Sequence, residues 1–266
     1  MLAFDLATAF IANTLPLAAR HTCVLTGESY HSVMHYLAGI SILLAVAFSA
    51  AANDDPPPFV AVYALSQGSV SFGTMERRFE LNDDGTYRFV SRMKTSGVIA
   101  LIRSDKITES SSGQLRNGHF EPASYSYHNS HGDKHHALRF DYHDNVVVRS
   151  DQADGWRTAM LGPVLDKLVY QMQMMLDLAN EPSNLNYTVA DKNKLKNYRF
   201  DNQGRESIET HSGSYTTVRL ERGASDNDRR TVVWCAEALH WLPVKVEYRE
   251  KDGSVTTALL RSFSQL

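Results

Sequence analysis

The sequence predicts a mainly β fold, a strongly curved antiparallel sheet or β-barrel of about twelve strands with one main helix packed on it. Apolar and polar residues alternate along most of residues 59–266, and turn signals containing Gly, Asn or Asp separate the alternating segments. Helical spacing is confined to residues 161–179. Because up-and-down antiparallel sheets remove their open edges by curling or closing, we expect curvature within one β-rich domain.

An export signal precedes this domain. Residues 34–52 read MHYLAGISILLAVAFSAAA, with a short apolar core and with the small residues Ala50 and Ala52 that signal peptidase accepts. We expect cleavage after Ala52 and export to the periplasm, which leaves no stable transmembrane span; an uncleaved membrane anchor is the alternative. Residues 1–33 are an irregular leader or a misassigned start, and residues 53–58 form a Pro-rich linker.

Alternation and turns define the first half of the domain. Gln67-Gly68 and Asn82-Asp83-Asp84-Gly85 predict hairpin turns, because glycine supplies the positive φ that tight turns need. The strands expected on this basis lie at 59–65, 70–81, 87–93, 106–112, 125–127, 138–142 and 146–148.

The predicted helix spans residues 161–179. Its apolar residues recur with helical spacing, Pro163 suits a first turn, and Pro182 follows the end. The apolar positions are Leu161, Leu165, Leu168, Met172, Met175, Leu176 and Ala179.

Alternation resumes after the helix. Strands are expected at 187–190, 195–201, 206–211, 215–221, 231–236, 242–249 and 255–262, and we find no short-period repeat.

Charge and cysteine content exclude several classes of protein. The chain has 27 Lys and Arg against 30 Asp and Glu, without the basic stripe of a nucleic-acid or acidic-membrane binder. Cys23 lies in the leader, so Cys235 has no cysteine with which to form an internal disulfide after cleavage. We interpret Cys235 as a small buried hydrophobic residue.

Several motifs, taken in order, resemble a family of bacterial exported proteins, the domain of unknown function 3108. The segment Asp166–Met172 is similar to the family's D-x-L-S-x-x-Y-Q-L helix, although Val169 stands where the family has Ser. The resemblance covers about residues 59–263 and implies no catalytic residue. It implies a fold similar to the curved antiparallel sheet of periplasmic lipoprotein carriers. The other segments that carry it are 85–87, 118–125, 198–200, 206–210, 216–220, 233–236 and 240–246.

The methionine-rich helix is the first candidate site. Methionine adapts to variable apolar shapes, so the helix is a candidate wall of a cavity for an acyl chain or a hydrophobic peptide. Ordinary core packing against the sheet is the alternative. The candidate cavity residues are Leu168, Met172, Met175 and Leu176 of the helix with Tyr125, Tyr127, Phe140, Tyr142 and Trp234 of the sheet.

A histidine-rich hairpin is the second candidate site. His128, His131 and His135 are weak candidates for metal ligands, because imidazole suits zinc or copper. The neighbouring His135 and His136 point to opposite faces of a strand, however, which favours a solvated hairpin and no cofactor. Motifs of serine hydrolases, zinc proteases, Walker loops and dinucleotide sites are absent from the sequence, so no catalytic residue is assigned.

These observations favour a non-catalytic binding or carrier module for a hydrophobic ligand, a lipid or acyl chain, in the periplasm. An alternative is a cell-envelope protein-interaction module with a filled core, which predicts an exposed apolar patch. A metal-dependent or hydrolytic enzyme is a further alternative, and it predicts buried polar groups converging in one pocket. The sequence leaves ligand, partner and oligomeric state open.

Overall fold

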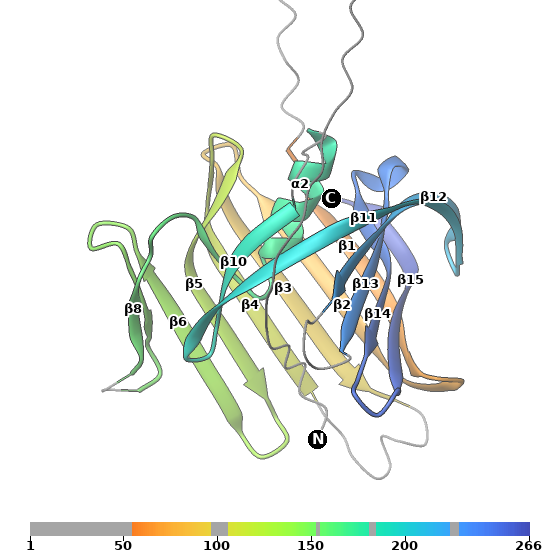
Figure 1. Ribbon diagram of the computed structural model, residues 1–266, viewed down its shortest axis with the longest axis horizontal. Helices are drawn as coiled ribbons and strands as arrows, with labels where there is room; N and C mark the ends of the chain where they lie inside the picture. The colour runs from red at the N-terminus through yellow and green to blue at the C-terminus, as the bar shows by residue number, and fades with distance from the viewer. Residues whose placement is uncertain (1–54, 97–105, 153–154, 181–184, 224–228) are drawn as a thin grey trace, which may run out of the picture. The chain divides into compact units, whose positions relative to one another are not determined.

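The structure is a computed structural model that describes residues 55–96, 106–152, 155–180, 185–223 and 229–266 (Figure 1). The predictions for residues 1–33 and for the signal peptide 34–52, with cleavage after Ala52, lie outside the described residues. Within the described part, no helix is long and apolar enough to cross a membrane.

The predicted fold class is confirmed, with fifteen strands in the described residues rather than about twelve. They form one sheet in the order β8-β7-β6-β5-β4-β3-β2-β1-β15-β14-β13-β12-β11-β10-β9, antiparallel throughout except between β9 and β10. The strands of the first half are β1 Phe59–Gln67, β2 Val70–Leu81, β3 Thr86–Thr95, β4 Lys106–Arg116, β5 His119–Asn129, β6 Lys134–Asp141, β7 Val146–Arg149 and β8 Arg157–Ala159. Those of the second half are β9 Val164–Asp166, β10 Leu185–Asp191, β11 Lys194–Thr210, β12 Gly213–Gly223, β13 Arg230–Ala236, β14 Leu242–Arg249 and β15 Val255–Gln265.

Alternation along the strands builds the core on the inner face of the sheet. In β1, Phe59, Ala61, Tyr63 and Leu65 are buried, while the residues between them are partly exposed. The predicted turn at Gly85 forms with φ +79°, and a Cβ there would lie 2.8 Å from the Leu115 carbonyl oxygen. Glycine therefore satisfies both the turn and the close approach of the neighbouring chain.

The predicted helix 161–179 is wrong in its first half. The α-helix is α2, Tyr170–Ala179; a short 3₁₀ helix, η1, spans Glu237–Leu239. Residues Val164–Asp166 instead form β9, which pairs in parallel with Thr188, Val189 and Ala190 of β10, and Leu161 is 97% exposed. A short apolar run does not distinguish a buried strand from a helical turn by periodicity, which explains the error.

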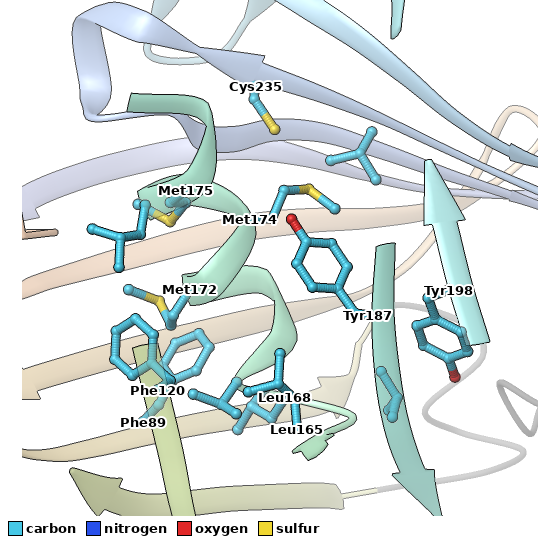
Figure 2. Packing of buried hydrophobic residues seen from close by; sticks show 14 of the residues in the cluster. Phe89, Phe120, Leu165, Leu168, Met172, Met174, Met175, Tyr187, Tyr198 and Cys235 are labelled. Atoms are coloured by element: carbon cyan, nitrogen blue, oxygen red, sulfur yellow. The ribbon is translucent and has the colours of Figure 1, made fainter. Parts of the chain in front are cut away.

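Helix α2 packs inside the curve of the sheet, between β5 and β10 (Figure 1). Its buried residues surround the helix rather than forming one stripe, as expected for a helix enclosed on most sides. In Figure 2, Met172 points toward Phe89 and Phe120, whereas Met174 points toward Tyr187 and Cys235. The helix thus fills the inner face with flexible apolar side chains.

Strand β11 replaces two predicted strands, 195–201 and 206–211. Its first part pairs with β10 and its second part pairs with β12, with a register shift between Asn202 and Arg205. Gly204, at φ +97°, lies in this irregular stretch. The change of partner lets one strand connect two parts of the curved sheet.

Candidate functional site

A cavity of ≈ 160 Å³ lies between the start of α2 and the inner face of the sheet. This is far more than the roughly 15 Å³ that one water molecule needs. Tyr170 and Gln171 contribute the wall on the helix side. The apolar wall on the sheet side includes Leu65, Met75, Met93, Ile107, Val233 and Val246.

The strand register explains how this apolar wall forms. Met75 of β2 lies opposite Met93 of β3, which lies opposite Ile107 of β4. These three side chains therefore form one cross-strand row on the same face of the sheet. The row gives the cavity a flexible, sulfur-rich side.

A polar row runs beside the apolar one. Arg77 of β2 lies opposite Ser91 of β3, which lies opposite Glu109 of β4. Arg77 donates a hydrogen bond to the Gln171 Oε1 of α2, and the Tyr125 hydroxyl donates to Glu109 Oε1 at 2.6 Å. The polar row thereby joins the beginning of the helix to the sheet.

A second arginine contributes to the cavity wall from β12. Arg222 is 5% exposed, and its Nη2 donates to Thr231 Oγ1 at 3.1 Å. Its Cζ lies 3.8 Å from the centre of the Tyr198 ring, close enough for a cation–π interaction. Tyr170 packs edge-on against the same ring, with centroids 5.3 Å apart, so arginine, tyrosine and helix form one contiguous cluster.

A buried ion-pair group lies next to this cluster. The Lys196 Nζ lies 2.6 Å from Asp191 Oδ2, and the Lys167 Nζ lies 3.7 Å from Asp191 Oδ1. Lys167 also lines the cavity. Because Asp191 is almost fully buried, pairing with the two ammonium groups compensates for the loss of its hydration.

Asp166 fixes the start of the helix. Its Oδ1 accepts the backbone N–H groups of Leu168 and Val169, each at 2.8 Å, and its Oδ2 accepts the Ser111 hydroxyl at 2.6 Å. Burial raises the Asp166 pKa to about 6, although these hydrogen bonds favour the carboxylate. The side chain therefore ties β9, β4 and the start of α2 together beside the cavity.

The predicted helix residues lie in the packed core next to this cavity rather than along its wall. Leu168, Met172 and Leu176 are buried core residues, and Met175 borders a separate groove with Leu178. Lys167 and the first two residues of α2, Tyr170 and Gln171, form the helix side of the cavity instead. Their role as ligand contacts stays a prediction.

The predicted aromatic residues are distributed over both faces of the sheet. Tyr125 and Phe140 are buried in the core, and Tyr127 stacks on His136 with centroids 5.0 Å apart. Tyr142 is 41% exposed. Trp234 alternates with the cavity-lining Val233 and so faces the other side of β13, where its indole N–H contacts Glu206 and Lys245 lies over its ring.

The histidine hairpin forms as β5 and β6. His128 and His135 lie opposite each other across these strands, while the His131 backbone N–H donates to Asn129 Oδ1 in the turn. Among the residues that the structure describes, no group of three or more His, Cys, Asp or Glu side chains could hold a metal ion.

The residues predicted from the sequence do not include the charged residues of the cavity wall, which are Arg77, Glu109, Lys167 and Arg222. A signal was available for the two arginines. Arg77 interrupts the inward series Met75 and Phe79, and Arg222 follows the buried Leu220 at the two-residue period of a strand. A cation at an inward position of an apolar strand indicates a buried partner or a site.

Comparison with solved structures places the fold among known proteins. The β-barrel-like protein of domain of unknown function DUF1849 from Brucella abortus is 10% identical, with a TM-score of 0.55, over 79% of this chain and 98% of that chain. A candidate outer membrane lipoprotein-sorting protein domain from Vibrio parahaemolyticus is also 10% identical over 79% of this chain and 85% of that chain, with a TM-score of 0.30. The Brucella protein shares the fold with this chain.

Comparison of sequences gives the family. No curated protein sequence matches the chain. The family described as "Protein of unknown function (DUF3108)" matches residues 61–260, most of the chain and nearly all of the β-rich domain. The order of motifs from Gly85 to Val246 had indicated this family, and the chain belongs to it.

Proposed function

We propose that this protein is an exported, non-catalytic carrier that holds a hydrophobic ligand, a lipid or an acyl chain, in the cavity beside α2. The observation that carries the proposal is the space of ≈ 160 Å³ left between helix and sheet beside the buried apolar core. Burial of an apolar chain is worth roughly 25 cal/mol per Å² of its surface. Met75 and Met93 suit a ligand of variable shape.

The cavity favours a carrier over an interaction module with a filled core. A filled core would leave no such space between Tyr170 and the Met75–Met93–Ile107 row. Export is supported by the apolar segment and the Ala50-x-Ala52 pattern of residues 34–52. Together these features support a carrier that works outside the cytoplasm, in the cell envelope.

Native mass spectrometry tests the proposal. The full-length chain is expressed with its own leader in a Gram-negative host and purified from the periplasm without detergent. We expect an added mass in the lipid range that disappears on denaturation. Purification of the wild-type protein without bound lipid, followed by failure to take up any acyl probe, would contradict the proposal.

A variant that narrows the cavity makes the test specific. Ala258 lines the cavity from β15, so Ala258→Phe places a ring in the ligand space and should lower the fraction of lipid-bound protein. Thr257 is its neighbour on the opposite face of the strand, and Thr257→Phe serves as the matched control. Equal lipid occupancy in both variants would place the bound lipid outside this cavity.

A further inference from the structure

We propose that the cavity binds the anionic head group of a single-chain amphiphile, with the guanidinium groups of Arg222 and Arg77 as the anion-binding groups. The methionine-rich row beside them takes the apolar chain. The inference rests on the proposed carrier function and names the class of ligand. It follows from an imbalance between buried positive charge and its partners in the cavity wall.

Arg222 is the first observation. Its side chain forms part of the cavity wall and is 95% buried, yet its Nη1 has no hydrogen-bond partner. Among the described residues, no carboxylate lies within 4 Å of its guanidinium. Buried arginines are normally paired with an anion, because removing the charge from water is costly. The ring of Tyr198, 3.8 Å from Cζ, supplies only part of that compensation.

Arg77 repeats this arrangement from the other side of the cavity. It donates to Gln171 Oε1 and lies over the Tyr63 ring at 5.5 Å, but its Nε is buried without a hydrogen-bond partner. Within the described chain it too has no carboxylate within 4 Å. A guanidinium presents several N–H donors in a planar fork that matches carboxylate and phosphate oxygens.

Positive groups from separate parts of the chain line this one cavity, whose helix side includes Tyr170. Arg222, Arg77 and Lys167 each lower the Tyr170 pKa electrostatically, against a larger increase caused by burial. These residues come from β12, β2 and the segment between β9 and α2, which are distant in sequence. Folding therefore concentrates cationic groups at the start of the helix.

Glu109 of the cavity wall and Asp191, which pairs with the wall residue Lys167, already have partners. Asp191 is paired with Lys196 and Lys167, and Glu109 accepts the hydrogen bond of the Tyr125 hydroxyl. Neither carboxylate lies within 4 Å of the Arg77 or the Arg222 guanidinium group, so neither forms an ion pair with them. The remaining requirement is an oxyanion, which an acyl ligand with a carboxylate or phosphate head group would supply.

The position of the chain follows from the register. Met75 precedes Arg77 by two residues and so lies on the same face of β2, next to the row that continues through Met93 and Ile107. A head group held by Arg77 would direct its first methylene groups along this row. The polar subsite for the head group therefore lies next to the apolar subsite for the chain, as binding of an amphiphile requires.

Four probes with a ten-carbon chain test the inference by isothermal titration calorimetry: decanoic acid (whose tenth carbon is the carboxyl carbon), decyl phosphate, decanol and decyltrimethylammonium. The full-length chain is expressed with its own leader, purified, and freed of co-purified lipid on a hydrophobic resin. We expect the acid or the phosphate to bind at least tenfold more tightly than decanol, and the ammonium compound to bind most weakly. Preference between the acid and the phosphate identifies the head group.

Substitutions assign the effect to Arg222. Arg222→Met keeps a long apolar side chain and removes the charge, and it should weaken binding of the anionic probe about 10- to 100-fold while leaving decanol unchanged. Arg219→Gln removes a cation from the opposite face of β12 and is the matched control. Arg222→Lys should restore part of the affinity.

The outcomes separate the inference from the proposed function. Equal affinity for decanoic acid and decanol, or undiminished binding of the anionic probe to Arg222→Met, would overturn the inference while the carrier function stands. Failure of all four probes to bind the lipid-free wild-type protein would overturn both.

Discussion

Two arginine side chains interrupt the apolar inner face of the sheet, Arg222 buried and Arg77 partly buried. Arg77 and Arg222 occupy inward positions of strands whose other inward residues are apolar, and both lie at the cavity. The face of the strand on which each arginine lies could be predicted from the sequence, because successive side chains of a strand alternate between faces. The common position of the two arginines at one cavity could not, because it depends on the order of strands between β2 and β12 in the sheet.

Asp166 makes stability depend on pH. Its folded-state pKa of about 6 lies above the ordinary aspartate value of 3.8, so the folded state binds its proton more tightly than the unfolded state. Its contribution to the free energy of unfolding is therefore full below about pH 4 and is lost as pH rises through 6. The shift corresponds to about 3 kcal/mol.

Asp166→Asn should remove this dependence. The amide oxygen can still accept the N–H groups of Leu168 and Val169, so the start of the helix is retained. Urea unfolding of both proteins between pH 4 and pH 7 gives the difference curve. The wild type should lose about 2 kcal/mol relative to the variant over that range, most of the full shift.

Other titrating groups cancel in this comparison. Burial lowers the His136 pKa to about 4, so its contribution is lost as pH falls below about 6.5, which opposes the effect of Asp166. His136 is present in both proteins. Parallel stability curves for the wild type and Asp166→Asn would show that Asp166 is not the group responsible.

The sequence predicts the bounds of a helix or strand correctly where turn residues set them. It fails where pairing with a distant strand sets them. The hairpin at Asn82–Gly85 follows from the φ that glycine permits. The strand Val164–Asp166 has the same apolar character as a helical turn, and only its parallel pairing with residues 188–190 makes it a strand. That pairing is non-local, so spacing within 161–169 could not reveal it.

Gln173 anchors α2 to the sheet through both ends of its amide. Its Oε1 accepts the Phe120 backbone N–H at 2.9 Å, and its Nε2 donates to the Gly118 carbonyl at 3.1 Å. Gln173→Met keeps the side-chain length but leaves both backbone groups without these partners. We expect a loss of about 2–4 kcal/mol in the free energy of unfolding, measured by urea denaturation.

A matched surface change controls for the chemistry of this substitution. Gln203 is exposed on β11, so Gln203→Met should change stability by no more than about 0.5 kcal/mol. Equal effects at the two positions would show that the Gln173 hydrogen bonds do not hold the helix in place.

The fold class of the whole molecule could be predicted because the same alternation of apolar and polar residues occurs in many strands. Alternation recurs in strand after strand, so errors such as dividing β11 into two left the class unchanged. The cavity wall depends instead on which strands become neighbours, for example β1 beside β15, whose segments Phe59–Gln67 and Val255–Gln265 lie at opposite ends of the domain. The cavity is therefore lined by strands that are distant in sequence, and no single segment of the sequence predicts it.

The predicted export signal belongs to the scale of the whole chain, because export would determine where a carrier acts. We expect the mature protein to begin at Asn53, because Ala50 and Ala52 are the small residues that signal peptidase requires before the cleaved bond. N-terminal sequencing of protein from the periplasmic fraction measures this directly. Leu43→Arg introduces a charge into the apolar core of the signal and should leave the uncleaved chain in the cytoplasmic fraction.

The control for this experiment changes the leader without changing the signal. A chain that starts at Met34 retains MHYLAGISILLAVAFSAAA and should yield the same mature N-terminus as the chain that starts at Met1. A mature N-terminus upstream of Met34, or unimpaired export of Leu43→Arg, would show that residues 34–52 are not the signal. In that case a ligand would have to be sought in another compartment, although the cavity and the two guanidinium nitrogens without hydrogen-bond partners, Arg77 Nε and Arg222 Nη1, would be unchanged.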